Sequence, residues 1–98
     1  MAISIYEKKA DYVAQLEKVL DVSKHFDSID YARDYLRGDE FVRIKNVVGD
    51  TFYINVTGNS ESAILLEVSR FLTGVRPTGF VTSKEARLRA SQLFRKAV

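Results

Sequence analysis

Apolar residues recur at helical spacing near the start of the chain, alternate with polar residues in its middle, and return to helical spacing in its second half. In residues 4–24 an apolar side chain falls at every third or fourth position, which is typical of a helix that covers a core with one face. Ser4 and Glu7 have the spacing of a capping box, in which both side chains bind backbone N–H groups at the helix start. We therefore predict a first helix over residues 4–24.

A second, shorter helix is predicted over residues 28–37. Asp27 can cap its first turn, and Phe26 and Tyr31 have the spacing of a hydrophobic staple around that cap. Gly38 follows as the residue that ends the helix in a left-handed conformation. The apolar residues of this segment are Ile29, Ala32, Tyr35 and Leu36, so the helix would bury only a narrow stripe.

Residues 41–57 alternate between apolar and polar side chains, as the two strands of a hairpin do. Val42 and Ile44 must share a face with the apolar residues of the second strand. A two-residue loop would put the two apolar sets on opposite sides of the ribbon, so the loop must hold an odd number of residues. We predict a three-residue loop made of residues 48–50 or of residues 49–51.

A two-stranded ribbon by itself is only marginally stable. Helices must therefore cover its apolar face, or a third strand must join one of its edges. Residues 80–82 or a second chain could supply that strand.

The strongest apolar stripe of the chain follows the hairpin. Asn59 or Ser60 can cap this helix, which ends at Gly74. Its stripe consists of Ile64, Leu65, Val68, Phe71 and Leu72, and Leu66 lies roughly opposite. We expect the stripe to pack on the hairpin and Leu66 to remain exposed.

A turn over residues 75–79 leads to the last helix. Pro77 suits an early position of such a turn, and a glycine closes it. Thr82 and Glu85 have capping-box spacing. One side of the helix that follows carries Ala86, Ala90, Leu93, Phe94 and Ala97.

These elements predict an α+β fold, with one small globular domain over residues 1–98. The predicted order is α-α-β-β-α-α, with four helices packed on one face of a two-stranded antiparallel hairpin. A chain of 98 residues can bury a sizeable core without disulfides or metals.

Composition excludes several kinds of site. The chain has no cysteine, which rules out disulfides, thiolate nucleophiles and cysteine-based metal sites. The first residues lack the order of a signal peptide, and no apolar run approaches the roughly 20 residues that span a bilayer. We therefore predict a soluble cytoplasmic protein that does not act at a membrane.

No catalytic signature is present either. The single histidine, His25, is close in sequence to Asp27 and Asp30, but Asp27 is explained as a helix cap and a metal would need more ligands. The chain has neither a nucleophile elbow nor a phosphate-binding glycine loop. We predict no catalytic residue, no cofactor and no metal site, and therefore a protein that is not an enzyme.

Charge is distributed unevenly along the chain. The net charge is only +2, yet residues 1–40 carry six Lys/Arg against nine Asp/Glu, while residues 67–98 carry seven against two. The outer hairpin face and the last helix therefore form a candidate surface for nucleic acid or an acidic partner. Its residues are Arg43, Lys45, Tyr53, Asn55, Arg87, Arg89, Arg95 and Lys96. Cross-strand polar pairs on a solvated face would explain the hairpin residues equally simply.

Two function classes follow. The first is a small non-enzymatic binding or regulatory module that acts through protein–protein contacts, including contacts within a homodimer. It is favoured by the open edges of a two-stranded sheet and by the five Tyr and six Phe of so small a chain. The alternative is a nucleic-acid-binding protein that uses the basic last helix and the outer hairpin face. Neither requires a small-molecule cofactor.

Overall fold

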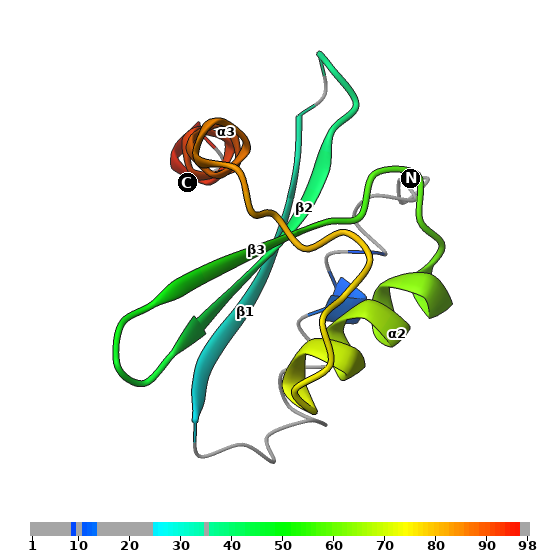
Figure 1. The fold of residues 1–98 in the computed structure, drawn as a ribbon. Helices are drawn as coiled ribbons and strands as arrows, with labels where there is room; N and C mark the ends of the chain where they lie inside the picture. Colours follow the sequence, from blue (N-terminus) through cyan, green and yellow to red (C-terminus); the bar gives the residue numbers. More distant parts are fainter. Residues whose placement is uncertain (1–8, 10, 14–24, 35, 97–98) are drawn as a thin grey trace.

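The computed structural model describes residues 9, 11–13, 25–34 and 36–96, and over these residues it shows an α+β fold (Figure 1). A three-stranded antiparallel sheet has the strand order β1-β2-β3. Its strands are β1 (Phe26–Arg33), β2 (Glu40–Asn46) and β3 (Thr51–Asn55), and the helices that follow are α2 (Glu61–Leu72) and α3 (Lys84–Lys96). Residues 9 and 11–13 are also helical. The described part of the chain thus contains three helices rather than four.

The helices lie on both faces of the sheet, with α2 on one side and α3 on the other (Figure 1). Alternation along β2 explains this arrangement, because Val42 and Ile44 belong to the core beneath α2 while Phe41 belongs to the core beneath α3. The prediction of four helices on one face is therefore wrong. Tyr53, which we assigned to the outer hairpin face, is buried beneath α3 together with Phe41.

Two apolar clusters fill the spaces between the layers. The buried residues on the α2 side are Val13, Ile29, Val42, Ile44, Ile54, Val56, Ile64 and Val68. Those on the α3 side are Ala32, Phe41, Tyr53, Val81, Ala90 and Phe94. Helices α2 and α3 therefore pack on two separate cores, and Val13 shares the core of α2.

The segment predicted as a second helix is strand β1 instead. Its residues pair with β2 in antiparallel register, with Ile29 opposite Ile44 and Tyr31 opposite Val42. The spacing of its few apolar residues fits a helix as well as a strand, so the backbone pairing offered by β2 decides the outcome. A strand next to β2 also completes the ribbon that would have been marginal alone.

The hairpin loop has an odd number of residues, as predicted, but it begins one residue before the earlier of the two predicted loops. The Asn46 N–H donates to the Asp50 carbonyl oxygen at 3.0 Å, which leaves residues 47–49 as the loop. The Asp50 N–H in turn donates to Asn46 Oδ1 at 2.8 Å. This closure places Ile44 opposite Phe52, so the apolar residues of both strands share the α2 side.

Further pairing at the β3 edge comes from residues 79–81 of the same chain. The Asn55 N–H donates to the Gly79 carbonyl oxygen at 2.7 Å, and the Val81 N–H donates to the Tyr53 carbonyl oxygen at 3.0 Å. The prediction that residues 80–82 could extend the sheet is thus confirmed in part. No second chain is needed to pair this stretch of β3.

Gly79 lies where only glycine fits, so Gly79→Ala should lower the free energy of unfolding by about 1–3 kcal/mol. An added Cβ would overlap the backbone carbonyl oxygen of Asn55. Urea unfolding measures the loss, and Thr82→Ala, at an exposed position shortly after the bridge, is the control. A Gly79→Ala variant as stable as the control would show that the bridge does not hold residues 79–81 against β3.

Helix α2 confirms its predicted faces. Ser60, rather than Asn59, caps it by accepting a hydrogen bond from the Ala63 N–H at 3.2 Å. Ile64 and Val68 are fully buried, and Leu66 is 54% exposed. Of the other stripe residues, Leu65, Phe71 and Leu72 are half-buried.

Helix α3 begins one residue later than the predicted capping box, since Ser83 accepts the hydrogen bond from the Ala86 N–H at 3.1 Å. Of the predicted first helix, only residues 9 and 11–13 fall within the described part of the chain, where they are helical and Val13 reaches the core. The rest of residues 4–24 lies outside the described residues. Among the described helices, none has the length and apolarity to cross a membrane.

Candidate functional site

An apolar groove lies where α2 ends and the chain turns back toward the sheet. We call it the aromatic groove, and it encloses about 430 Å³. It is lined by Phe71, Gly74, Val75, Arg76, Pro77, Phe80 and Thr82. Among these residues only Arg76 is charged, so the groove combines an apolar floor with a single cation.

Local hydrogen bonds hold the groove in shape. Gly74 adopts φ +85° after the last turn of α2, and the Val75 N–H donates back to the Arg70 carbonyl oxygen at 2.8 Å. The Thr78 N–H donates to the Glu67 carboxylate at 2.8 Å, which ties the turn to α2. The segment that forms the groove is therefore anchored at both ends, to the helix by these bonds and to β3 by residues 79–81.

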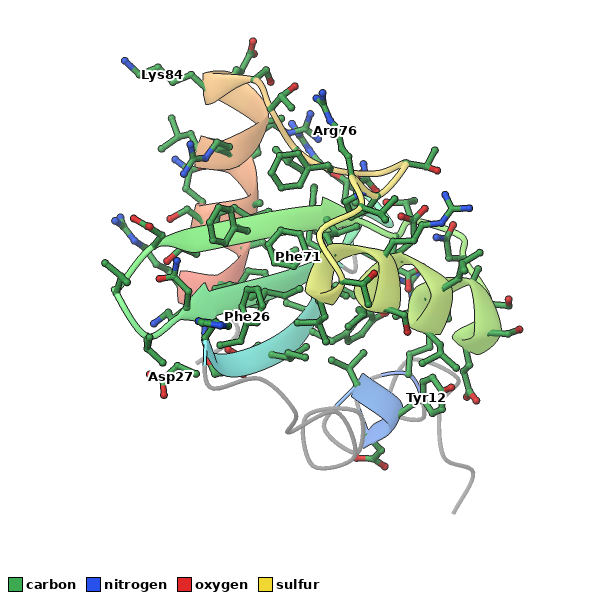
Figure 2. All side chains as sticks on the ribbon, turned by 60° about the horizontal axis from the view of Figure 1, so that its bottom comes forward. Tyr12, Phe26, Asp27, Phe71, Arg76 and Lys84 are labelled. Carbon is green, nitrogen blue, oxygen red and sulfur yellow. The ribbon has the colours of Figure 1, made fainter. Side chains whose placement is uncertain are left out.

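A row of phenylalanine rings forms and extends the groove floor. The Phe71 ring centroid lies 5.1 Å from that of Phe52, 5.5 Å from that of Phe26 and 6.0 Å from that of Phe80. All four side chains are half-buried. Figure 2 shows Phe71 between Phe26 and Arg76 in this view, so the row leads from the start of β1 to the groove. Such rings can contact an apolar partner without leaving their places in the core.

Arg76 stacks at the edge of this row. Its guanidinium carbon lies 5.7 Å from the centroid of the Phe80 ring, while the residue as a whole is exposed. Within the described residues the Arg76 guanidinium has no ion pair, whereas Arg43 pairs with Asp30 at 2.7 Å and Arg89 with Asp39 at 2.8 Å. The ring orients the cation, and its N–H donors remain available to a carboxylate.

Two of the eight residues predicted as a binding surface lie under α3. Tyr53 is 8% exposed, and its ring centroid is 5.9 Å from that of Phe94. The Arg43 guanidinium lies over the Phe94 ring at 4.5 Å and binds Asp30. Neither a stacking ring nor an unpaired cation is therefore presented at these two positions.

The other predicted residues are spread over several places. Lys45 is exposed opposite Thr51, whose carbonyl oxygen accepts a hydrogen bond from Arg87 Nη2 at 3.4 Å. Lys45 and Arg87 are thus brought to the same end of the sheet. Asn55 Oδ1 accepts hydrogen bonds from Thr57.

The remaining predicted residues belong to α3. Arg89 pairs with Asp39, and Arg95 is exposed. The side chain of Lys96 lies outside the described part. Whether the predicted set binds a partner stays a prediction.

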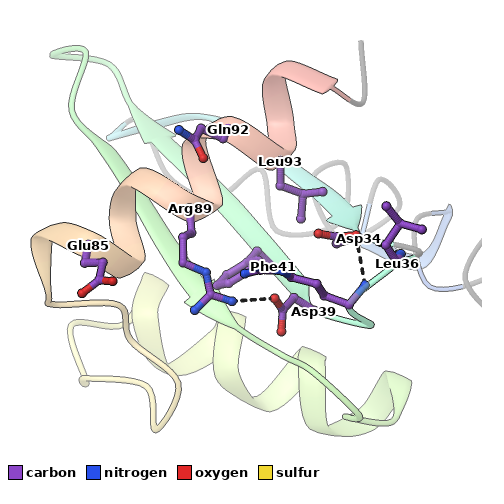
Figure 3. A pocket seen from close by; sticks show the side chains of 9 residues that line it. Asp34, Leu36, Asp39, Phe41, Glu85, Arg89, Gln92 and Leu93 are labelled. Atoms are coloured by element: carbon purple, nitrogen blue, oxygen red, sulfur yellow. Dashed lines mark hydrogen bonds and ion pairs between the residues drawn. The ribbon is translucent and has the colours of Figure 1, made fainter.

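A second cavity of about 450 Å³ lies between α3 and the loop that joins β1 to β2 (Figure 3). Its lining residues are Asp34, Leu36, Arg37, Asp39, Phe41, Glu85, Arg89, Gln92 and Leu93. The ion pair between Arg89 and Asp39 lies along it. The lining mixes three acids with two bases, so it carries no strong charge of either sign.

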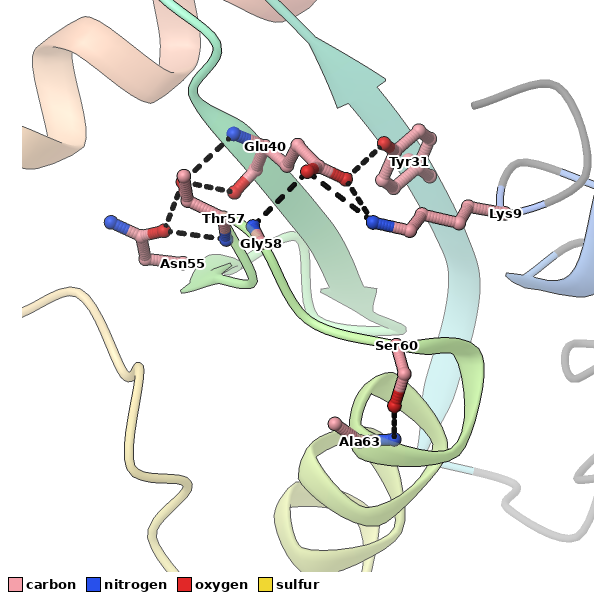
Figure 4. Close-up of polar contacts among 8 residues, drawn as sticks. All are labelled: Lys9, Tyr31, Glu40, Asn55, Thr57, Gly58, Ser60 and Ala63. Atoms are coloured by element: carbon pink, nitrogen blue, oxygen red, sulfur yellow. Dashed lines mark hydrogen bonds and ion pairs between the residues drawn. The ribbon is translucent and has the colours of Figure 1, made fainter. Parts of the chain in front are cut away.

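A buried carboxylate lies at the start of β2 (Figure 4). Glu40 is 3% exposed and forms an ion pair with Lys9, with 2.9 Å between Oε2 and Nζ. It also accepts hydrogen bonds from the Tyr31 hydroxyl and, at 3.1 Å, from the Gly58 N–H. We call Lys9, Tyr31, Glu40 and Gly58 the Glu40 cluster.

The Glu40 cluster is enclosed rather than open to a substrate. Burial by itself would raise the pKa of Glu40, but the hydrogen bonds from Tyr31, Lys9 and Gly58 outweigh it and hold that pKa below its ordinary value. The carboxylate is thus charged at neutral pH and is satisfied by its neighbours. We therefore assign Glu40 a structural role. Its carboxylate, which belongs to β2, binds Lys9 in the first helix, Tyr31 in β1 and Gly58 in the turn after β3. In the described part of the chain, no group of three or more metal-binding side chains is found.

The sequence did not lead us to the aromatic groove. Residues 75–79 read as a turn, and turns are ordinarily polar. The only local signal was the presence of Val75 and Phe80 in and just after that turn. Phe52, Phe71 and Phe80 come from three separate segments, so their contact is a product of the fold.

Comparison with known protein families, with curated proteins and with solved structures finds no match for this chain. What the chain does must therefore be argued from its own groove, charges and buried contacts.

Proposed function

We propose that this chain is a small non-enzymatic binding module that contacts a protein partner through the aromatic groove. The observation that carries the proposal is the combination of half-exposed phenyl rings with one exposed guanidinium that is stacked on Phe80 and lacks an ion pair within the described residues. Aromatic residues and arginine are the side chains most enriched where protein interfaces derive their binding energy.

The groove is large enough to take a side chain of a protein partner. Its volume of about 430 Å³ lies in the lower part of the range of about 300–1,000 Å³ typical of ligand pockets. The walls come from one continuous segment, residues 71–82, which hydrogen bonds hold to α2 and β3. A partner would therefore meet a preformed surface and lose little free energy in ordering it.

A photo-reactive phenylalanine analogue at position 75 should form discrete cross-links to protein in the cells that produce the chain. Val75 is 53% exposed at the groove. The same analogue at position 88 is the matched control, because Leu88 is 57% exposed on α3, on the opposite face of the sheet.

The cross-links from position 75 should also disappear when Phe80→Ser is added, since this change removes a ring from the groove floor. Circular dichroism of the purified variant checks that it remains folded. Identical adducts from positions 75 and 88, or adducts that persist in a folded Phe80→Ser variant, would contradict the proposal.

Nucleic-acid binding is the weaker proposal. It keeps the exposed cations Lys45, Arg87 and Arg95, which could contact phosphates. Tyr53 cannot contribute the base stacking that we expected, because its ring is covered by α3. A role of this kind would therefore rest on charge alone.

A further inference from the structure

The chain exposes a second apolar feature whose shape and charge complement the aromatic groove. Residues 47–49 form the hairpin loop, in which Val47 is 58% and Val48 is 82% exposed. Asp50, also exposed, follows directly. The loop is thus a convex apolar tip beside an acid, while the groove is an apolar hollow beside the cation Arg76.

The turn geometry of the hairpin does not require valine at positions 47 and 48. Tight loops favour Gly, Asn and Asp, because these residues accept left-handed backbone conformations or hydrogen-bond to the backbone nearby. Here Gly49 adopts φ +103°, and Asn46 and Asp50 close the loop, so the turn is already specified without the valines. Their exposed methyl groups remain to be accounted for.

The strand that follows the tip leads to the groove through the Phe52 ring. Phe52 comes two residues after Asp50, and its ring centroid lies 5.1 Å from that of Phe71 and 6.4 Å from that of Phe80. Phe52 therefore joins the base of the tip to the floor of the groove. When complementary features lie side by side on one face, a two-fold axis between them lets two copies satisfy both at once.

We infer that two copies of this chain pair through this face, with the tip of each (residues 47–50) in the aromatic groove of the other and Asp50 facing Arg76. The inference rests on the proposed role of the groove and names a second copy as its partner. Val47 and Val48 lie against the phenyl rings, and each Asp50 carboxylate accepts hydrogen bonds from the guanidinium stacked on Phe80. The two contacts are identical, so the assembly closes at two chains and forms no fibre.

Sedimentation of the full chain should show a monomer–dimer equilibrium. Arg76→Glu and Asp50→Arg should each raise the dimer dissociation constant about tenfold or more, because each places like charges together. Combining Arg76→Glu with Asp50→Arg restores opposite charges and should restore dimerisation. Arg95→Glu, which reverses an exposed cation on α3, is the matched control and should have no effect. Urea unfolding of each variant checks that it is folded.

Disulfide trapping gives an independent readout, because the chain has no cysteine of its own. A mixture of Val48→Cys chains and Val75→Cys chains should oxidise to a mixed dimer faster than a mixture of Val48→Cys and Leu88→Cys chains. A chain carrying both Val48→Cys and Val75→Cys should stop at covalent dimers.

Three results would overturn the inference: a monomer at every concentration, a dimer whose dissociation constant is unchanged by Arg76→Glu, or equal trapping rates in the two mixtures. If the chain is monomeric but position 75 still cross-links to a different protein, the inference fails and the proposed function stands. If position 75 gives no specific cross-link at all, both fail.

Discussion

Replacing Glu40 by glutamine should lower the free energy of unfolding by about 3–5 kcal/mol at neutral pH, because it removes the carboxylate charge that faces the buried Lys9 ammonium. Lys9 is 6% exposed, and its Nζ lies 2.9 Å from Glu40 Oε2. The double variant Lys9→Met/Glu40→Gln should recover much of the loss, since it removes the buried ammonium as well, while the amide oxygen can still accept from Tyr31 or Gly58. Urea unfolding measures all of these values.

Asp39→Asn is the control, because it breaks an ion pair with Arg89 that lies at the surface. Exposed pairs of this kind contribute about 0–1 kcal/mol. Equal losses in Glu40→Gln and Asp39→Asn would show that the Glu40 cluster is open to water.

The Glu40 cluster also predicts how stability depends on pH. Hydrogen bonds hold the pKa of Glu40 in the folded protein below the value it has in the unfolded chain. The unfolded chain therefore takes up a proton first as the pH falls, so the contribution of Glu40 is complete above about pH 5 and is lost progressively below it. The Glu40→Gln variant should lack this part of the acid dependence, while the Asp39→Asn variant should keep it.

Phe94→Ala should lower the free energy of unfolding by about 3–5 kcal/mol, as expected for a large ring removed from a core. Phe94 is 4% exposed, and it packs on Tyr53 and beneath the Arg43 guanidinium. Leu88→Ala on the same helix is the matched control, because Leu88 is largely exposed and should cost far less. Both values come from urea unfolding of purified variants.

This pair of variants tests the layer arrangement directly. If all helices covered one face of the sheet, Tyr53 would face water and the loss of the Phe94 ring would matter little. A Phe94→Ala variant no less stable than Leu88→Ala would show that α3 does not pack on the second face.

The candidate site was less predictable than the fold. A surface was predicted from the clustering of Arg43, Lys45, Tyr53 and Asn55 on one strand face, and alternation did place Arg43 and Tyr53 together. What alternation cannot tell is whether a helix covers that face. Arg43 and Tyr53 have apolar or aromatic parts that a helix can bury, so the same residues suit an open surface and a core equally well.

Local pattern was sufficient for the hairpin and for α2. An apolar set that must share one face excludes an even loop, and this parity holds although the loop begins one residue early. The stripe of α2 likewise determined that Val68 is buried and Leu66 exposed. Both results follow from backbone periodicity, which is a property of a segment and its own side chains.

Only the tertiary structure decided the rest. Residues 26–33 carry an apolar pattern that is compatible with a helix or a strand. They form a strand because β2 offers an open backbone edge, and pairing there satisfies the hydrogen-bonding groups of both segments. The second face of the sheet became a core because α3 brings Ala90 and Phe94 to it. The aromatic groove has its shape because Phe71 lies in the last turn of α2 and residues 79–81 bind β3, and no local pattern encodes this pairing with a strand that is distant in sequence.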